Sequence, residues 1–191
     1  MPPNIESIII GLLLSDGFLS FSSSSSKNAR LGFEQSLANF GYLWSVFILL
    51  SNYCSSYPHL VIRKRSDKVF YSLKFYTRSM PYFTELHKIF YVKNIKIISA
   101  KIYNLLNPLA LSHMIMGDGT KLNQGLSLCT ESYSVKENLM LLNVLIIRYN
   151  FNCTLHKRNN SYRIHIYKKS MPLLRDIVNP YIIQTMEYKI N

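Results

Sequence analysis

The sequence predicts an α+β fold in which one αββαββα unit occurs twice in tandem. Two sets of landmarks predict the repeat. Asp-Gly ends an apolar stretch at residues 16–17 and again at 118–119, and Ser-Met-Pro precedes a later segment at 79–81 and again at 170–172. Helix-like and strand-like periodicities alternate in the same order after each Asp-Gly. An old tandem duplication with changes in loop length accounts for both features.

The first unit, residues 1–98, is expected to begin with an apolar helix. Asn4 can cap this helix, and Gly17 can adopt the left-handed conformation that ends it. A turn with five consecutive serines then separates two short strands, and Pro81 stands where the first turn of a later helix accepts proline. The elements expected in this unit are helix 4–15, strands 18–21 and 29–35, helix 39–53, strands 59–65 and 69–76, and helix 82–91.

The second unit, residues 99–191, repeats this order. Its apolar residues between 135 and 149 have the spacing of an amphipathic helix, and Pro172 opens the last helix. The elements expected in this unit are helix 109–117, a strand at 126–129, helix 135–149, strands 154–157 and 162–167, and a helix from Pro172 onward.

The charge balance of the chain is strongly basic. Its 191 residues include 22 Lys and Arg against 10 Asp and Glu, a net charge of +12. Such a field attracts polyanions, either nucleic acid or an acidic membrane surface. The longest early apolar run, residues 8–14, is much shorter than the roughly 18 residues that a membrane span needs, so we expect no membrane partner. No secretory signal or Arg-rich transit peptide is recognisable, and a protein acting in an organelle is expected to be made there.

The cysteine and aromatic residues bear on two other classes of protein. The three cysteines, Cys54, Cys129 and Cys153, include no CxxC pair, so neither a disulfide framework nor a zinc ribbon is expected. The many Tyr and Phe residues suggest a single-stranded RNA binder with stacking platforms. They fall mainly on helix faces, for example Phe40 and Trp44, and are therefore expected to belong to the core.

Two nine-residue stretches carry the most specific pattern in the chain. Residues 9–17 read Ile-Ile-Gly-Leu-Leu-Leu-Ser-Asp-Gly, and residues 111–119 read Leu-Ser-His-Met-Ile-Met-Gly-Asp-Gly. They resemble the two copies of the motif that names the LAGLIDADG homing endonucleases, and the repeat of the whole unit resembles the single-chain members of that family. The resemblance covers residues 4–190. It implies a pseudo-twofold arrangement, with the motif helices packed at the interface and two antiparallel sheets forming a DNA-binding saddle.

Small residues on the first motif helix fit such an interface. Gly11 and Ser15 lie one turn apart and share a face, which permits close approach of a second helix. The second motif departs from the family pattern, because His113 stands where the first has Gly11. The contact there is expected to come from Ser112 and Gly117. His113 itself is expected to be a packed residue rather than a ligand.

The two motif aspartates, Asp16 and Asp118, are the predicted catalytic and metal-binding residues. Each follows the C-terminal end of a helix, where the helix dipole is negative and where a carboxylate is stabilised by a nearby cation. The alternative for either residue alone is a simple turn residue. Two converging carboxylates favour Mg²⁺, with Ser15 and Gly117 included in the predicted metal site. We expect Mn²⁺ to substitute and Ca²⁺ to bind without cleavage.

Three further residues are candidates for the catalytic centre. Lys96 and Lys189 hold matching positions at the ends of the two units, and the resemblance implies that they face the cleaved phosphates, where an ammonium group stabilises developing charge. Gln35 resembles the polar residue that supports metal-bound water, and its counterpart is Thr130 or Glu131.

Polar and basic residues cluster at four hairpins and before the two Pro-initiated helices. Strand ribbons fit the major groove of DNA, where base edges can be distinguished, and Lys and Arg contacts to phosphate set affinity. The predicted DNA-binding residues are Ser22, Lys27, Asn28, Arg30, Arg63, Lys64, Arg65, Lys68, Arg78, Lys121, Asn123, Gln124, His156, Lys157, Arg158, Asn160, Arg163, His165 and Lys169.

The resemblance implies a monomeric, Mg²⁺-dependent, site-specific homing endonuclease. It would make a double-strand break in a long DNA target and so promote the mobility of its own intron in a mitochondrial or other organellar matrix. Two alternatives stay open at the level of the sequence. One is an RNA maturase of the same fold that binds its own intron RNA and assists splicing. The other is a basic structural nucleic-acid protein without catalysis.

Overall fold

The computed structural model describes residues 1–191 and contains two four-stranded antiparallel sheets. The first sheet has the strand order β1-β2-β4-β3, and the second has the equivalent order β7-β8-β10-β9. The strands of the first sheet are β1 (Phe18–Phe21), β2 (Ala29–Ser36), β3 (His59–Arg65) and β4 (Lys68–Tyr76). Those of the second are β7 (Gly119–Leu122), β8 (Gly125–Leu128), β9 (Cys153–Arg158) and β10 (Ser161–Tyr167).

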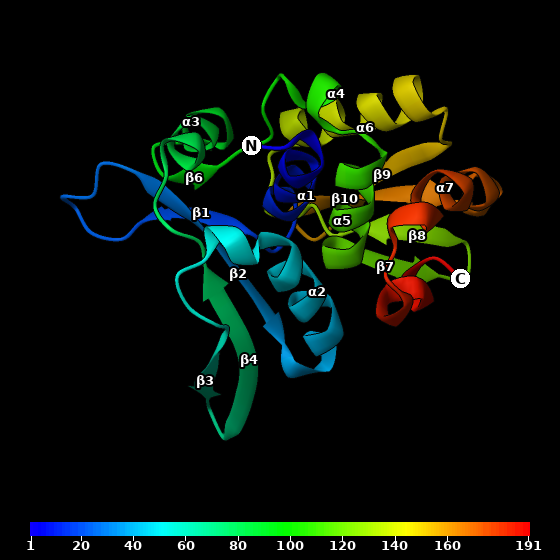
Figure 1. Ribbon diagram of the computed structural model, residues 1–191. Helices are drawn as coiled ribbons and strands as arrows, with labels where there is room; N and C mark the ends of the chain where they lie inside the picture. Colours follow the sequence, from blue (N-terminus) through cyan, green and yellow to red (C-terminus); the bar gives the residue numbers. More distant parts are fainter.

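Three helices accompany each sheet in the same chain order. They are α1 (Pro3–Leu13), α2 (Phe40–Leu50) and α3 (Pro81–Phe90) in the first half, and α5 (Pro108–Asp118), α6 (Val135–Tyr149) and α7 (Met171–Val178) in the second. A short β5–β6 ribbon (Tyr91–Val92 and Ile95–Lys96) and helix α4 (Ile102–Leu105) connect the halves. The predicted α+β fold with a repeated αββαββα order is confirmed (Figure 1).

The pairing of the strands is also equivalent in the two sheets. Phe18, two residues after the first motif aspartate, pairs with Gly32, and Thr120, two residues after the second, pairs with Ser127. Gly32 and Ser127 therefore occupy matching positions in the two sheets. Residues at equal distances from these two along β2 and β8 also match.

Helices cover one face of each sheet and leave the other face open. In the first sheet Leu31, Phe33 and Phe75 point toward the helices and are buried. In the second sheet Ile164 and Ile166 do the same. The buried apolar residues of both halves form one continuous cluster. Strand side chains alternate between the two faces, so we call the face turned away from the helices the open face.

The two motif helices, α1 and α5, lie side by side at the centre of the molecule (Figure 1). They approach closely enough that a Cβ on Gly11 would lie 2.4 Å from the backbone oxygen of Ala110 and 2.6 Å from the Cβ of His113. One turn later the roles reverse, because a Cβ on Gly117 would lie 2.6 Å from the Cβ of Ser15. Each glycine faces the larger residue of the opposite helix. Gly11, Ser15 and Gly117 thus make the expected contact, whereas the Ser112 hydroxyl donates to the Leu109 carbonyl in its own helix.

Several local expectations need correction. Asn4 does not cap α1, because the helix already begins at Pro3 after Pro2. The β7 strand was not among the predicted elements, since it is short and carries exposed residues. On α2, Tyr42 and Phe47 are buried, but Phe40 and Trp44 stack on each other with 47% and 37% of their surface exposed. They belong to the surface rather than to the core.

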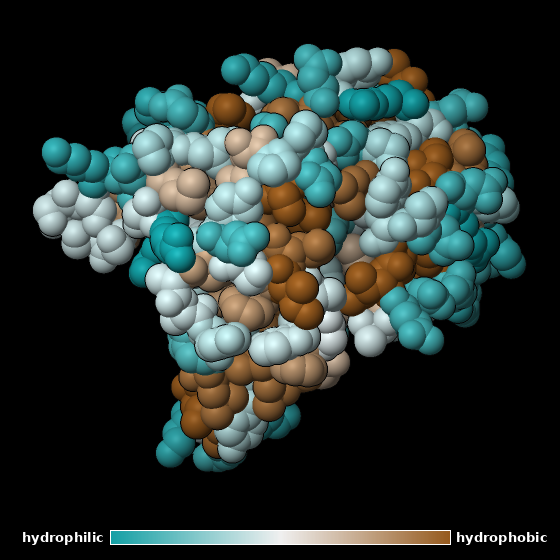
Figure 2. Space-filling model, in the orientation of Figure 1, coloured by the Kyte–Doolittle hydropathy of each residue, from teal (hydrophilic) through white to brown (hydrophobic).

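The β3–β4 hairpin extends beyond the helices that cover the rest of its sheet (Figure 1). Its helix-side face is apolar and exposed, and it includes Leu60, Ile62 and Tyr71. Apolar colour accordingly marks this projection in the space-filling view (Figure 2). None of the helices combines the length and apolar character that crossing a bilayer requires.

Candidate active site

Asp16 and Asp118 meet at the neighbouring ends of α1 and α5. Asp16 follows α1, and Asp118 is the last residue of α5. A Cβ on Gly117, which precedes Asp118, would lie 3.0 Å from the Asp16 Oδ2. Asp16 is exposed and Asp118 is half-buried. Packing of the two motif helices therefore places both carboxylates at one shared site.

The electrostatics of this site favour a cation. Burial, together with the negative charge of Asp16, raises the pKa of the Asp118 carboxyl to about 7. Lys96 and Lys189 oppose this rise only in part. Each carboxylate also stands at the negative end of a helix dipole. A divalent cation would offset all three unfavourable contributions.

The predicted lysines lie beside the aspartates but bind the ends of the motif helices. The Lys96 Nζ donates to the carbonyl oxygens of Ser15 at 2.9 Å and Gly17 at 2.6 Å. The Lys189 Nζ donates to the Gly117 carbonyl at 2.7 Å. Burial lowers the pKa of Lys96 to about 8, while Asp118 and Asp16 act in the opposite direction. Burial likewise lowers the pKa of Lys189.

Gln35 reaches the site from the helix-side face of β2. Its Nε2 donates to the Asp16 Oδ2 at 2.6 Å, and its Oε1 accepts from the Asn39 Nδ2 at 3.0 Å. The strand pairing makes Thr130 its counterpart, because both stand three residues after the matching positions Gly32 and Ser127. The Thr130 hydroxyl donates instead to the Tyr162 carbonyl. The two aspartates therefore have different polar neighbours.

The donor set of the site fits a hard divalent cation. It offers two carboxylates and the carbonyl oxygens of Ser15 and Gly117, each of which accepts one lysine hydrogen bond and keeps a second lone pair. No group of three or more His, Cys, Asp or Glu residues is assembled anywhere in the protein. Mg²⁺ is typically held by one or two carboxylates together with substrate phosphates and water. A closed zinc site, which needs about four nitrogen or sulfur ligands, does not match.

His113 is a packed residue rather than a ligand. It is buried, and its Nδ1 lies 3.1 Å from the Tyr42 hydroxyl. Burial lowers the pKa of His113 to about 4, so its ring is neutral at physiological pH. The pair joins α2 of the first half to α5 of the second.

The strand pairing separates the predicted DNA-binding residues into three groups. Those on the open face are Arg30, Arg63, Arg65, Lys68, His156, Arg158, Arg163 and His165. Those in turns and connections are Ser22, Lys27, Asn28, Arg78, Asn123, Gln124, Asn160 and Lys169. Those whose strand position directs them to the helix-side face are Lys64, Lys121 and Lys157. Among the first group, His165 is buried beneath the stacked ring of His156.

The open face also holds residues that hairpin clustering did not indicate. Lys74 and Tyr76 belong to it through their pairing with Glu34 and Gly32. Arg30 stacks on the Tyr76 ring at 3.9 Å. Lys74 and Tyr76 lie in the last three residues of β4, far from the β3–β4 turn, so the clustering of basic residues at hairpin turns does not indicate them. Alternation from Ser72 along β4 would have indicated them.

The chain belongs to the LAGLIDADG DNA endonuclease family, whose family model matches residues 6–174. This membership confirms the resemblance drawn from the two motifs. The sites formed by Asp16 and Asp118 lie at the ends of the two helices that carry those motifs.

Relatives of two kinds are similar to this chain. The cytochrome b mRNA maturase bI2 of Saccharomyces cerevisiae is 36% identical over 98% of this chain and 47% of its own length. A probable intron-encoded endonuclease 1 of Wickerhamomyces canadensis is 30% identical over 97% of this chain and 83% of its own length. The chain spans less than two thirds of the length of the two bI2 maturases that it matches.

Among solved structures, the homing endonuclease I-WcaI bound to its DNA recognition sequence is similar to this chain. The TM-score is 0.91 at 27% sequence identity, and the match covers 99% of this chain and 86% of that one. The fold described above is therefore that of a homing endonuclease.

Proposed function

We propose that this chain is a site-specific DNA endonuclease that cuts both strands of a long duplex and thereby promotes the mobility of the intron that encodes it. The observation that carries the proposal is the meeting of Asp16 and Asp118 at the ends of two packed helices. A basic protein that only binds nucleic acid does not require two carboxylates at its centre. Metal-dependent phosphodiester hydrolysis does, because carboxylates hold the divalent cations that activate water and stabilise the leaving oxygen.

Asp16 and Asp118, with the carbonyl oxygens of Ser15 and Gly117, would hold Mg²⁺ between the two strands of the target. The bound ions supply Lewis-acid activation of water and stabilisation of the leaving oxygen. Mn²⁺ has the same preference for oxygen ligands and is expected to replace Mg²⁺. Ca²⁺ is expected to support DNA binding without cleavage.

The surrounding residues fix the acids in place. Lys96 and Lys189 donate to the last carbonyl groups of the motif helices, and we expect their ammonium groups to face the scissile phosphates. Gln35 restrains the Asp16 carboxylate through the hydrogen bond to Oδ2. Restraint of this kind reduces the reorganisation that the reaction would otherwise require.

The open faces of the two sheets would bind the duplex. Arg30, Arg63 and Arg158 are on this surface, and the net charge of +12 attracts the phosphate backbone. We assign residues 1–98 to one half of the target and residues 99–191 to the other. A single chain then suffices for both halves, so we expect a monomer in complex with DNA.

Cleavage of an intron-free junction tests the proposal. The wild-type chain is incubated with Mg²⁺ and duplex DNA that joins the two exons flanking its intron. A double-strand break is expected, and Asp16→Asn and Asp118→Asn should bind the same duplex without cutting it. Binding without cleavage by the wild type would instead support the structural nucleic-acid protein.

A second function is supported by the relatives that are named cytochrome b mRNA maturase bI2. We propose RNA maturation as the alternative activity, with the chain's own intron RNA as partner. Both functions imply action in the mitochondrial or other organellar matrix where the intron is transcribed. Splicing of the intron RNA in the presence of the chain, combined with failure to cut junction DNA, would favour the maturase.

A further inference from the structure

The open face carries one carboxylate that the catalytic centre does not use. Glu34 is the only acidic residue in the strands of the two four-stranded sheets. It points to the open face, because its neighbours Phe33 and Gln35 point to the helix side and are buried. An acid on a surface that binds a polyanion costs affinity, so its presence needs a separate reason.

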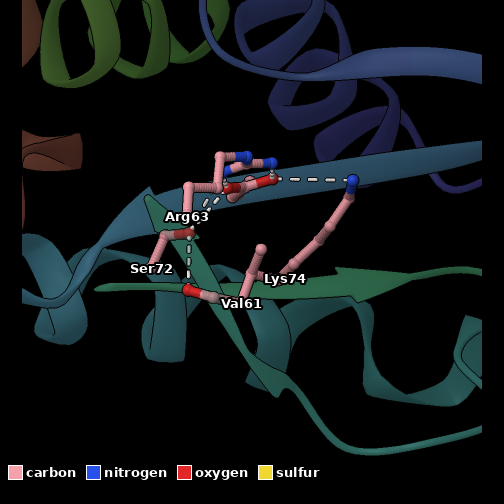
Figure 3. A network of polar contacts seen from close by, with 5 residues as sticks. Val61, Arg63, Ser72 and Lys74 are labelled. Carbon is pink, nitrogen blue, oxygen red and sulfur yellow. Dashed lines mark hydrogen bonds and ion pairs between the residues drawn. The ribbon is translucent and has the colours of Figure 1, made fainter. Parts of the chain in front are cut away.

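Three side chains converge on Glu34 from β3 and β4 (Figure 3). The Arg63 guanidinium makes a two-pronged contact, in which Nη2 donates to Glu34 Oε2 at 2.8 Å and Nη1 donates to Oε1. The Ser72 hydroxyl donates to Oε1 at 2.6 Å, and the Lys74 Nζ lies 3.5 Å from Oε2. Glu34 thus accepts three hydrogen bonds and faces two cations, so the cluster itself occupies most of its acceptor capacity.

Arg63, in contrast, keeps donors for a ligand. Its side chain remains 56% exposed while that of Glu34 is only 15% exposed. A guanidinium carries five N–H groups in a rigid fork, and the contact with Glu34 uses two of them. Nη1 also donates to the Ser72 hydroxyl at 3.4 Å, and the exposure of the side chain leaves its other N–H groups accessible on the open face. Arginine binds guanine through O6 and N7, which is the most frequent specific contact in the major groove.

The cluster around Glu34 lies close to Asp16 of the proposed cleavage site. A hollow of about 500 Å³ on the protein surface is lined by Asp16, Glu34, Arg63 and Ser72, among others. A base pair read by Arg63 would therefore lie close to the phosphate attacked at Asp16. In the second half a different carboxylate, Glu131, contacts Arg163 on the open face.

We propose that Glu34 is a specificity-determining positioning residue, which holds Arg63 in the orientation that reads a guanine next to the cleavage site. The inference rests on the proposed function, because it requires duplex DNA on the open face. The negative charge of Glu34 lowers the affinity of the protein for the DNA phosphate backbone, while the fixed orientation of Arg63 increases discrimination between bases. Without it, Arg63 is a flexible cation that binds any nearby phosphate.

Binding of wild-type protein and Glu34→Gln to DNA tests the proposal. The wild-type target is first obtained by selection from a library of randomised duplexes in Ca²⁺, and both proteins are then measured against every single-base-pair variant of it. In Glu34→Gln we expect affinity for unrelated duplexes to rise and discrimination at one guanine-containing position to fall about tenfold. Glu34→Asp should restore part of this discrimination.

Two further variants separate positioning from charge. Arg63→Lys keeps the charge but loses the planar fork, and it should lose discrimination at the same position as Glu34→Gln. Arg148→Lys is the matched control, because Arg148 is an exposed arginine on α6, which covers the opposite side of the second sheet from the open face, and this variant should keep the base preferences of the wild type. If Glu34→Gln changes affinity for all duplexes equally, Glu34 does not position Arg63. Failure of the wild type to select any duplex would instead overturn the proposed function.

Discussion

The two halves of the molecule share their topology but not their chemistry at the centre. Asp16 is exposed and accepts a hydrogen bond from Gln35, whereas Asp118 is half-buried, has its pKa raised to about 7, and has Thr130 where the other half has glutamine. Lys96 binds two carbonyl groups, and Lys189 binds one. The backbone repeat has therefore been preserved, while the surroundings of the two motif aspartates have diverged. The two strands of a target need not be cut with equal ease.

The largest effect is expected from loss of either motif aspartate. Asp16→Asn and Asp118→Asn each remove a charge that the cation requires, and cleavage of both strands should fall by about a thousandfold or more. Plasmid linearisation in Mg²⁺ measures this loss, and binding in Ca²⁺ is the control for folding. If one variant still cuts one strand at the wild-type rate, the halves work independently and the shared-site interpretation is wrong.

A large loss of stability is expected at the helix interface. In Gly11→Ala the new Cβ would meet the Ala110 backbone oxygen at 2.4 Å, and backbone cannot move aside as a side chain can. We expect the free energy of unfolding to fall by about 3 kcal/mol, measured by urea denaturation. Gly41→Ala is the matched control, because its Cβ would meet only the Thr185 side chain at 2.9 Å. Equal losses in the two variants would contradict the tight contact between α1 and α5.

His113 should make stability depend on pH. Its folded pKa of about 4 lies below the ordinary value of 6.5, so the unfolded chain takes up a proton first as the pH falls. The contribution is fully present above about pH 6.5 and is lost as the pH falls toward 4, by about 3 kcal/mol in total. Chemical denaturation across this range should show a flatter profile in His113→Gln. A profile in His113→Gln that is as steep as that of the wild type would contradict this assignment.

The smallest effect on cleavage is expected from replacing Gln35, which contacts Asp16, or its counterpart Thr130. Gln35→Ala removes a hydrogen bond to Asp16, and we expect cleavage of one strand to slow about tenfold. Thr130→Ala removes no bond to Asp118 and should have less effect. Accumulation of nicked plasmid by the first variant and not by the second would sharpen the difference between the halves. Equal nicking by both variants would show that Gln35 contributes nothing particular.

Much of the fold followed from periodicity in the chain. The helix predicted at residues 135–149 and the strand predicted at 59–65 have those bounds in the structure, because their apolar spacing and turn residues are unambiguous. Phe40 and Trp44 were misplaced because helical spacing identifies a shared face but not which of its residues another element covers. The β7 strand was missed because four residues with three exposed side chains lack an alternating pattern.

The site was predicted as a set of residues but not as a geometry. Asp16 and Asp118 were recognisable from their repeated motif. The contact between Gly117 and Ser15, and the binding of Lys96 to helix carbonyl groups, depend on how two distant helices cross. The roles of Glu34 and Lys74 depend on strand pairing. A shift of one residue in that pairing would move them to the other face, and no local pattern fixes it.

The contact between the motif helices limits how this protein can be rebuilt. Gly11 packs against His113, and Gly117 packs against Ser15, so the two helices are complementary in shape. Two copies of the first helix would leave a void where His113 now stands, and two copies of the second would collide there. A hybrid enzyme assembled from this chain and a relative must therefore inherit both helices together, or redesign both.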